Sequence, residues 1–199
     1  MLQKSVSLKG VFALFLTFLL FNAIQAADVG FELGLGFDTS GDRSDILEKA
    51  YGGDSSGLGM FLELQAGVPI GVTDNVVIKP ELSYLLGFVK VEGTYSDDTY
   101  IDSIFIPSLS VEYYINSRKE NSFFVGANIG YPAPSSGSDG EYELEKDGVS
   151  YGVYGGYSFG GNSKIMLGYR SIPIEAVYAN DVKESANLGG VLFRFAYTF

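Results

Sequence analysis

Eight segments of the chain alternate apolar and polar residues with a period of two, and this alternation is the strongest constraint on the fold. In the final segment, GGVLFRFAYTF, large apolar residues occupy every second position from Val191 to Phe199. Successive side chains of a β-strand point to opposite faces, so each segment predicts a strand with one apolar face. The segments cover residues 28–38, 57–67, 76–88, 105–114, 122–131, 149–159, 164–170 and 189–199.

The connections between these segments alternate in length. Those after the first, third, fifth and seventh segments are long, polar and acidic, over residues 38–56, 89–102, 132–148 and 175–186, and the others are short. Strands joined by long loops at one end and tight turns at the other are typical of an up-and-down barrel. The segment lengths also suit strands that cross a bilayer. We therefore expect an all-β fold, an eight-stranded antiparallel transmembrane β-barrel, as one domain over residues 27–199.

Residues 1–26 have the order of a secretory signal peptide. Lys4 and Lys9 precede the apolar run Val11–Phe21, and a stretch ending at Ala26 follows. The run is short for a membrane-spanning helix, so we expect a cleaved leader at 1–26, with an uncleaved anchor as the alternative. This leader predicts that the protein is exported.

The composition excludes several classes of function. The chain has 13 basic and 24 acidic residues, and two of the basic residues lie in the leader, so the balance opposes nucleic-acid binding. It contains no cysteine and no histidine, which removes thiol chemistry and the side chain that most often activates serine or water. We expect no enzyme, no cofactor and no metal centre, although a mechanism based on carboxylates alone stays open.

The two faces of the strands indicate which one meets lipid. The apolar faces are bulky and continuous in every segment, whereas the opposite faces carry glycine, serine and ions. Tyrosine and phenylalanine gather near the segment ends, as in the aromatic girdles of membrane barrels. This pattern favours a barrel with an apolar exterior and a narrow polar interior over the alternative, a soluble β-barrel.

The C-terminal segment resembles the terminal signature of Gram-negative outer-membrane β-barrel proteins. The pattern as a whole, over residues 28–199, resembles their small eight-stranded group, such as the OmpA N-terminal barrel and the OmpX/Ail proteins. The resemblance implies an outer-membrane location with both termini in the periplasm, contact with membrane lipids, and recognition of the last strand by the barrel-assembly machinery. No motif selects the activity of one member. The residues that carry the signature are Val191, Phe193, Phe195, Tyr197 and Phe199.

Seven ionisable residues stand on the predicted interior faces. Because charges in a narrow lumen are costly unless paired, we expect a plugging network completed by hydrogen bonds from Gln65, Ser108, Ser110 and Asn128, with an ion pathway as the alternative. Partners cannot be assigned without the strand register. The predicted lumen charge network is Glu32, Glu63, Lys79, Glu81, Glu112, Arg170 and Arg194.

The long connections hold most of the acidic excess. Asp97–Asp98 and Asp139–Glu141 offer oxygen ligands for divalent cations, but they lack the spacing of a known calcium loop, and solvation is the simpler role. An extracellular ligand is a further candidate partner. In the first connection, SDILEKAY suggests one or two helical turns capped by Ser44.

Two irregularities interrupt the strand pattern. Pro80 and Pro107 lie inside segments, where proline removes a ladder hydrogen bond, so we expect a bulge or an interfacial position at each. The seventh segment changes phase near Ser171–Pro173, after which Ile172, Ile174 and Ala176 carry the apolar register; a bulge there, with the strand continuing above the membrane, is expected.

The sequence favours a non-enzymatic outer-membrane barrel with a filled lumen and acidic outer loops, serving envelope integrity or surface interaction. The alternative is a narrow pore or a channel for small or apolar solutes, as in the OmpW-like group that the chain resembles in size.

Overall fold

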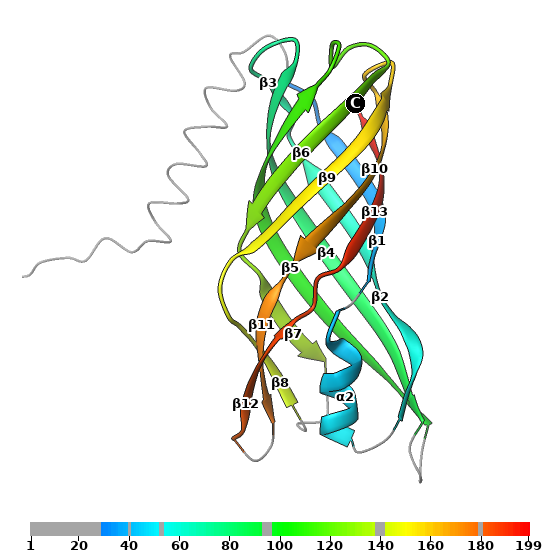
Figure 1. Cartoon of the computed structure of the whole chain (residues 1–199), viewed down its shortest axis with the longest axis vertical. Coiled ribbons are helices and arrows are strands. Elements are labelled where there is room, and N and C mark those ends of the chain that lie inside the picture. The colour runs from blue at the N-terminus through cyan, green and yellow to red at the C-terminus, as the bar shows by residue number, and fades with distance from the viewer. Residues whose placement is uncertain (1–28, 40, 52–53, 93–96, 138–141, 179–180) are drawn as a thin grey trace, which may run out of the picture.

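The chain forms a closed antiparallel barrel, seen in a computed structural model that describes residues 29–39, 41–51, 54–92, 97–137, 142–178 and 181–199 (Figure 1). Each of the eight predicted segments forms a barrel strand, and the last strand pairs with the first. The barrel strands are β1 (Glu32–Thr39), β2 (Asp54–Gly67), β4 (Val76–Glu92), β5 (Asp97–Tyr114), β6 (Ser122–Gly130), β9 (Ser150–Phe159), β10 (Ser163–Ser171) and β13 (Val191–Thr198).

Closure between β1 and β13 removes the exposed edge that an aromatic terminal strand would otherwise leave. The two strands pair without a register shift, from Glu32 opposite Thr198 to Asp38 opposite Leu192. Beyond the strands, Phe199 N donates to Phe31 O at 2.8 Å, which extends the pairing to the C-terminal residue. The barrel is therefore sealed by backbone hydrogen bonds along its whole seam.

The two ends of the barrel differ. The short connections and the C-terminus lie at one end, with the two-residue strand β3 (Ile70–Gly71), and we call this the turn end; it is uppermost in Figure 1. The opposite end, the loop end, holds the long connections. Outside the barrel strands it contains α2 (Arg43–Tyr51), β7 (Ala133–Gly137), β8 (Tyr142–Lys146), β11 (Pro173–Tyr178) and β12 (Lys183–Asn187).

Much of the predicted loop sequence is regular structure. Strands β4 and β5 run on together to a pair between Glu92 and Asp97, so most of connection 89–102 is a long hairpin. Strands β8, β11 and β12 form a separate three-stranded sheet, with β11 in the middle. The loop end is thus a β-structure that extends the barrel.

The first connection contains the expected helix, although its predicted cap is wrong. Helix α2 begins at Arg43, so Ser44 lies inside it, and Ile46 N donates to Asp42 O at 3.2 Å. Ile46 and Leu47 of this helix are buried. They share one apolar core with side chains from the barrel strands, from the three-stranded sheet and from the segments beside it. These are Phe61, Leu85, Ile104, Ile106, Tyr142, Leu144, Ile172, Ile174, Ala176 and Leu188.

The phase change of the seventh segment marks a change of sheet. Strand β10 ends at Ser171, and β11 begins at Pro173 and pairs with β8 and β12 instead of the barrel strands. Ile172, Ile174 and Ala176 have no exposed surface, in agreement with the predicted apolar register. The chain leaves the barrel wall here, so the simple bulge that the sequence suggested is not what the structure contains.

The strand prolines produce no bulge between β4 and β5, contrary to that part of the prediction. The register of this pair is continuous from Val76 opposite Tyr113 to Glu92 opposite Asp97. Pro80 O accepts from Val68 N, and Pro107 O accepts from Tyr131 N, both on the side away from this pair. The backbone N and O of one residue point to the same side of a strand. The N–H group that each proline lacks would therefore also point away from the β4–β5 pair, to a side where the pairing with the other neighbouring strand has ended or is interrupted.

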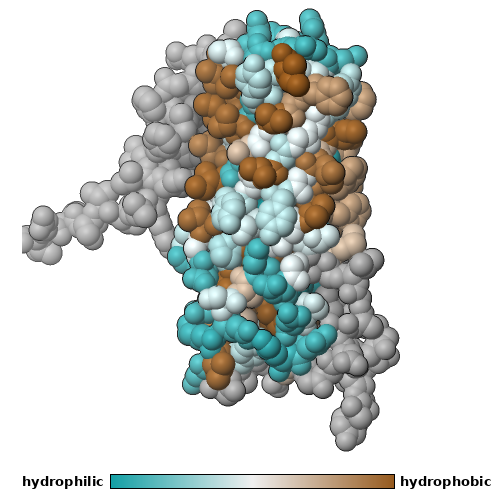
Figure 2. Space-filling model, in the orientation of Figure 1, coloured by the Kyte–Doolittle hydropathy of each residue, from teal (hydrophilic) through white to brown (hydrophobic). Residues whose placement is uncertain are grey.

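The outer wall carries an apolar belt. Figure 2 shows hydrophobic side chains over the upper part of the wall and hydrophilic ones at the turn end and around the loop end. Members of the belt such as Leu35, Val125 and Leu167 expose 49, 59 and 61% of their surface. Large exposed apolar areas of this kind identify a surface that meets lipid.

Three sequence predictions cannot be compared with the structure. The leader at residues 1–26 and the acidic pair at 139–141 lie outside the described residues, and the side chains of Asp97 and Asp98 are likewise outside the description. Within the described ranges, no helix has the length and apolar character needed to traverse a bilayer.

Candidate functional site

The barrel interior near the turn end holds a ring of two lysines and two glutamates. Lys79 Nζ lies 2.6 Å from Glu32 Oε1 and 3.0 Å from Glu112 Oε1. Lys164 Nζ lies 2.7 Å from Glu32 Oε2 and 2.7 Å from Glu112 Oε2. Each lysine therefore bridges both carboxylates, and each carboxylate uses both oxygens.

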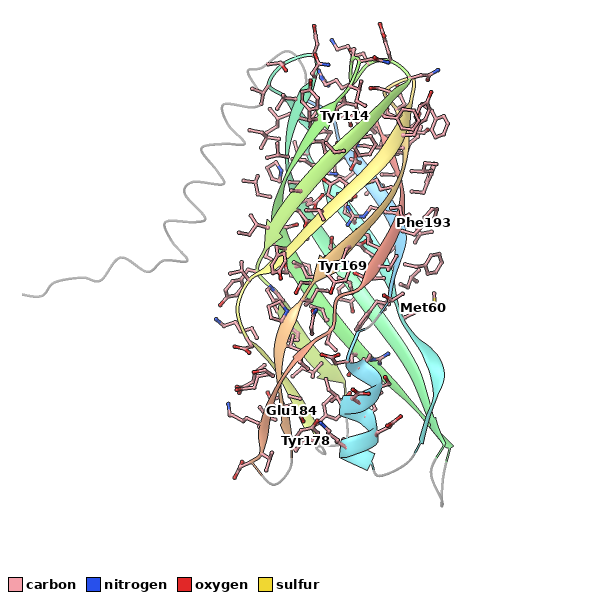
Figure 3. All side chains as sticks on the ribbon, in the orientation of Figure 1. Met60, Tyr114, Tyr169, Tyr178, Glu184 and Phe193 are labelled. Atoms are coloured by element: carbon pink, nitrogen blue, oxygen red, sulfur yellow. The ribbon has the colours of Figure 1, made fainter. Side chains whose placement is uncertain are left out.

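Two tyrosines donate hydrogen bonds to one carboxylate of this ring. Tyr114 OH donates to Glu112 Oε2 at 2.8 Å, and Tyr154 OH donates to Glu112 Oε1 at 3.3 Å. Tyr114 also stacks on Phe124, with ring centroids 5.1 Å apart. Figure 3 labels Tyr114 near the upper end of the barrel, which locates the ring below that end. Glu112 is therefore held by two phenol groups as well as by the two lysines.

A second group of ions follows toward the loop end. Glu63 accepts from two arginines, with Arg194 Nη2 at 2.7 Å and Arg170 Nη1 at 2.9 Å. Arg170 also contacts Asp38 Oδ2, through Nε at 2.8 Å. Charge-assisted bonds of this kind are among the stronger hydrogen bonds in proteins. The group binds β1, β2, β10 and β13 to one another across the lumen.

Glu81 connects the two groups. Its Oε2 lies 3.1 Å from Lys79 Nζ and 3.8 Å from Arg194 Nη1. Neutral donors complete its coordination: Gln65 Nε2 at 3.1 Å, Ser108 Oγ at 3.3 Å and Asn128 Nδ2 at 3.3 Å. The interior ions therefore form one continuous network across the described barrel strands.

All seven residues that the sequence assigned to the lumen lie buried in this network. Gln65, Ser108 and Asn128 lie beside Glu81, whereas Ser110 Oγ donates to the backbone oxygen of Lys79 at 3.4 Å. Two members were missed. Lys164 and Asp38 stand at the ends of predicted segments, but each has the parity of its inward neighbours, Met166 and Gly36, and that parity could have identified them.

A further ion pair lies between the network and the apolar core of the loop end. Arg43 Nε of α2 lies 2.8 Å from Asp102 Oδ2, and Tyr142 OH donates to Asp102 Oδ1 at 2.7 Å. Arg43 also lies over the ring of Phe61, at 5.3 Å from its centroid. These contacts anchor the first turn of α2 to the long hairpin β4–β5 and to β8.

The outer sheet of the loop end is linked by exposed ion pairs. Lys183 Nζ lies 2.8 Å from Glu175 Oε2 and 2.9 Å from Glu145 Oε2, which joins β12, β11 and β8. Hydrogen bonds from Lys183 to Glu175 and then to Glu145 raise the pKa of Lys183 above its ordinary value. Lys49 of α2 pairs with Glu184 at 2.6 Å, and Figure 3 labels Glu184 beside the helix.

The five residues of the terminal signature all lie on the outer face. Val191, Phe193, Phe195 and Tyr197 expose 40–51% of their surface, and Phe199 exposes 71%. Arg194, of opposite parity, has no exposed surface. The last strand therefore presents an unbroken apolar face to the exterior while its arginine joins the interior network.

Comparison with known proteins identifies the fold. No family model matches the chain, and no curated protein matches it. The outer membrane protein OprG from Pseudomonas aeruginosa is similar over 87% of this chain and 97% of its own, with a TM-score of 0.54 and 13% identity.

Two other solved structures align less well. They are the outer membrane protein AlkL, over 86% of this chain and 90% of its own (TM-score 0.44, 14% identity), and an outer membrane channel from Pseudomonas putida F1, over 87% and 97% (TM-score 0.34, 11% identity). The closed eight-stranded barrel, its apolar belt and the likeness to OprG give one conclusion: the chain has the fold of a small outer-membrane β-barrel protein.

Proposed function

We propose that the protein is a non-enzymatic outer-membrane barrel with a closed interior, and that it serves envelope integrity or surface interaction through its loop end. The turn end would face the periplasm, because outer-membrane barrels have short periplasmic turns and longer outer connections. The proposal depends chiefly on the state of the lumen.

The observation that carries the proposal is the burial of the ionic network, whose members expose at most 5% of their surface. Glu63, Lys79 and Arg194 have no exposed surface, so no space large enough for a water molecule adjoins them. A hydrated ion needs a continuous path of such space. The network is also nearly neutral in formal charge, with four cationic side chains (Lys79, Lys164, Arg170, Arg194) against five carboxylates (Glu32, Asp38, Glu63, Glu81, Glu112).

The loop end adds a second seal. Leu47 of α2 and the strand residues Phe61, Leu85 and Ile104 have no exposed surface and belong to one apolar core. An ion that passed the network would therefore meet packed hydrocarbon. Contacts between the protein and its surroundings would then take place on the outer surface of the loop end, where rigid scaffolds commonly carry function.

The residue types also support a role without catalysis. The chain contains no histidine and no cysteine, and the interior carboxylates are each held by cations. In the part of the chain that the structure describes, no cluster of three or more potential ligands could hold a metal ion.

A channel for small or apolar solutes is the second candidate, and one feature favours it. The interior wall of the loop end is apolar, as a path for an apolar solute would be, with Phe61, Leu85 and Ile104 facing α2. Transport along the barrel interior would require α2 to move away from this apolar wall and the ion pairs of the network to break. The channel therefore needs a conformation other than the one described here.

Permeation assays on liposomes separate the two candidates. Vesicles containing the purified barrel are loaded with a fluorescent potassium indicator, and entry of potassium and of an apolar dye is followed in parallel. The proposal predicts that both probes enter vesicles containing the barrel at the same rates as they enter protein-free vesicles. Accelerated entry of either probe, reduced by a variant that fixes α2 to the wall, would establish the channel instead.

A further inference from the structure

One lipid-facing position of the barrel lacks a side chain. Gly155 of β9 stands opposite Val125 of β6 and Leu167 of β10, both of which point outward. In the described parts of the eight barrel strands, Gly155 is the one glycine with this outward parity. The apolar belt therefore has a gap one residue wide, on the wall that Figure 2 faces.

This gap is a lined hollow of about 280 Å³. Gly155 and Gly156 form its floor together with Met166, and its lining is almost entirely apolar. The rims are outward-facing side chains of β6, β9, β10 and β13, namely Phe123, Tyr157, Ile165, Leu167 and Phe193. The rings of Phe123 and Tyr157 meet edge to face, with centroids 4.8 Å apart, and so form a firm wall at one side.

The backbone does not explain the glycine at this position. Gly155 is absent from the residues with positive φ. A Cβ added there would meet a single atom, Phe124 O, at an ordinary distance of 3.6 Å. The neighbouring Gly156 differs, because its Cβ would collide with the carbonyl oxygen of Ile165 and with the Phe124 ring. Gly156 is required by packing, whereas Gly155 leaves room that larger residues could occupy.

We infer that the hollow over Gly155 is a binding site for one phospholipid acyl chain. Glycine inside a strand weakens it, so an unforced glycine in the belt needs a compensating occupant. An unfilled hollow forfeits the dispersion contacts of its lining, and a hydrocarbon chain restores them. The hollow is continuous with the lipid-facing belt, so acyl chains reach it without crossing a polar surface.

The size of the hollow favours a lipid chain over a protein partner. A stable protein interface needs roughly 800 Å² from each side, with broad complementary surfaces. The space over Gly155 is instead an open apolar hollow of about 280 Å³, which suits a hydrocarbon chain. The paired rings of Phe123 and Tyr157 would also reduce the entropy lost when one chain settles there. The site rests on the apolar belt meeting lipid and is independent of whether the lumen conducts.

Tryptophan fluorescence can test this inference, because the chain contains no tryptophan. Val125→Trp places a reporter beside the hollow, and Leu35→Trp places one on β1, which is also lipid-facing but contributes no residue to the lining of the hollow. Each variant is purified in detergent and titrated with phosphatidylcholine that carries brominated acyl chains, which quench tryptophan at short range. We expect half-maximal quenching of the Val125→Trp reporter at a lipid mole fraction about fivefold lower than for Leu35→Trp.

Filling the hollow should remove this difference. Gly155→Leu, added to each reporter, is expected to make the two quenching curves coincide, and Gly155→Ala should give an intermediate shift. Ala127→Leu is the matched control, since it enlarges an outward-facing small residue of β6 that does not line the hollow. Heat-modifiable gel mobility confirms that each variant is folded. Equal curves for the two reporters, or a difference that survives in folded Gly155→Leu and Gly155→Ala, would overturn the inference.

Discussion

Arg194 Nη2 lies 2.7 Å from Glu63 Oε1, and neither side chain has any exposed surface. The arginine comes from the C-terminal strand β13 and the glutamate from β2, with β1 between them. This pair therefore connects β13, which closes the barrel against β1, to the interior network. Breaking a buried pair by removing one partner leaves a buried charge and commonly costs about 3–5 kcal/mol.

Arg194→Ala is expected to destabilise the folded barrel by about 3–5 kcal/mol, because Glu63 keeps Arg170 but loses its second cation. Urea unfolding in lipid vesicles, followed by the heat-modifiable gel shift, measures the change. Lys49→Ala removes the exposed pair with Glu184 and serves as the control, for which no measurable change is expected. Equal midpoints for the two variants would contradict the interior role of Arg194.

The ring of Lys79, Lys164, Glu32 and Glu112 should behave as a coupled unit. Because Lys164 bridges both carboxylates, Glu32→Gln and Lys164→Met are each expected to destabilise the barrel. The double variant should lose less stability than the sum of the single losses, by about 0.5–3 kcal/mol. A double-mutant cycle from urea midpoints gives this coupling energy, and strict additivity would show that the two side chains do not interact.

The outer sheet of the loop end should loosen at high pH. The folded pKa of Lys183 is raised by its hydrogen bonds to Glu175 and Glu145, so its stabilising contribution is complete below the unfolded value, about 10.4, and is lost as pH rises through the higher folded value. Digestion of the loop end by a protease active at alkaline pH should accelerate as the pH rises above the unfolded value of about 10.4. Lys183→Met lacks the ammonium group and should show no such acceleration. If the wild type and Lys183→Met have the same pH profile of digestion, Lys183 is not responsible for the loosening.

Phe199→Ala should slow assembly of the barrel in cells without a matching loss of stability. Phe199 is the most exposed of the terminal aromatics, and its ring lies 4.9 Å from that of Tyr197. Its proposed role is recognition by the assembly machinery. Pulse-chase labelling of the folded, heat-modifiable form measures the rate, and Phe31→Ala, at the residue just before β1 whose ring faces Phe199, is the control. Similar rates for both variants would indicate that Phe199 acts through packing alone.

The parity of residues in the sequence was enough to predict the barrel strands and their faces. Arg194 could be placed inside because its neighbours Phe193 and Phe195 are outside, and the same reasoning applies to Glu63 and Lys79. The partners of these ions could not be predicted, since they depend on the offset between strands and on which strands lie across the lumen. Glu63, for example, meets Arg170 from a strand 107 positions away.

The loop end was less predictable for a different reason. The apolar register of Ile172, Ile174 and Ala176 could be read from the sequence, but β8 and β12 are short and charged, so their alternation is weak. The pairing of β11 with these two strands joins distant segments and leaves little local signal in the sequence. Lys164 and Asp38 were missed because each stands where a predicted strand met a predicted connection.

Single-channel recording in planar lipid bilayers tests the closed interior most directly. The burial of Glu63, Lys79 and Arg194 predicts that the wild-type barrel, inserted from detergent, gives no steady current in symmetric potassium chloride. Insertion is verified separately by the heat-modifiable gel shift of reconstituted protein. A steady wild-type current whose amplitude changes in Glu112→Gln or Arg194→Ala would contradict the closed lumen and identify the ionic network as part of a pore.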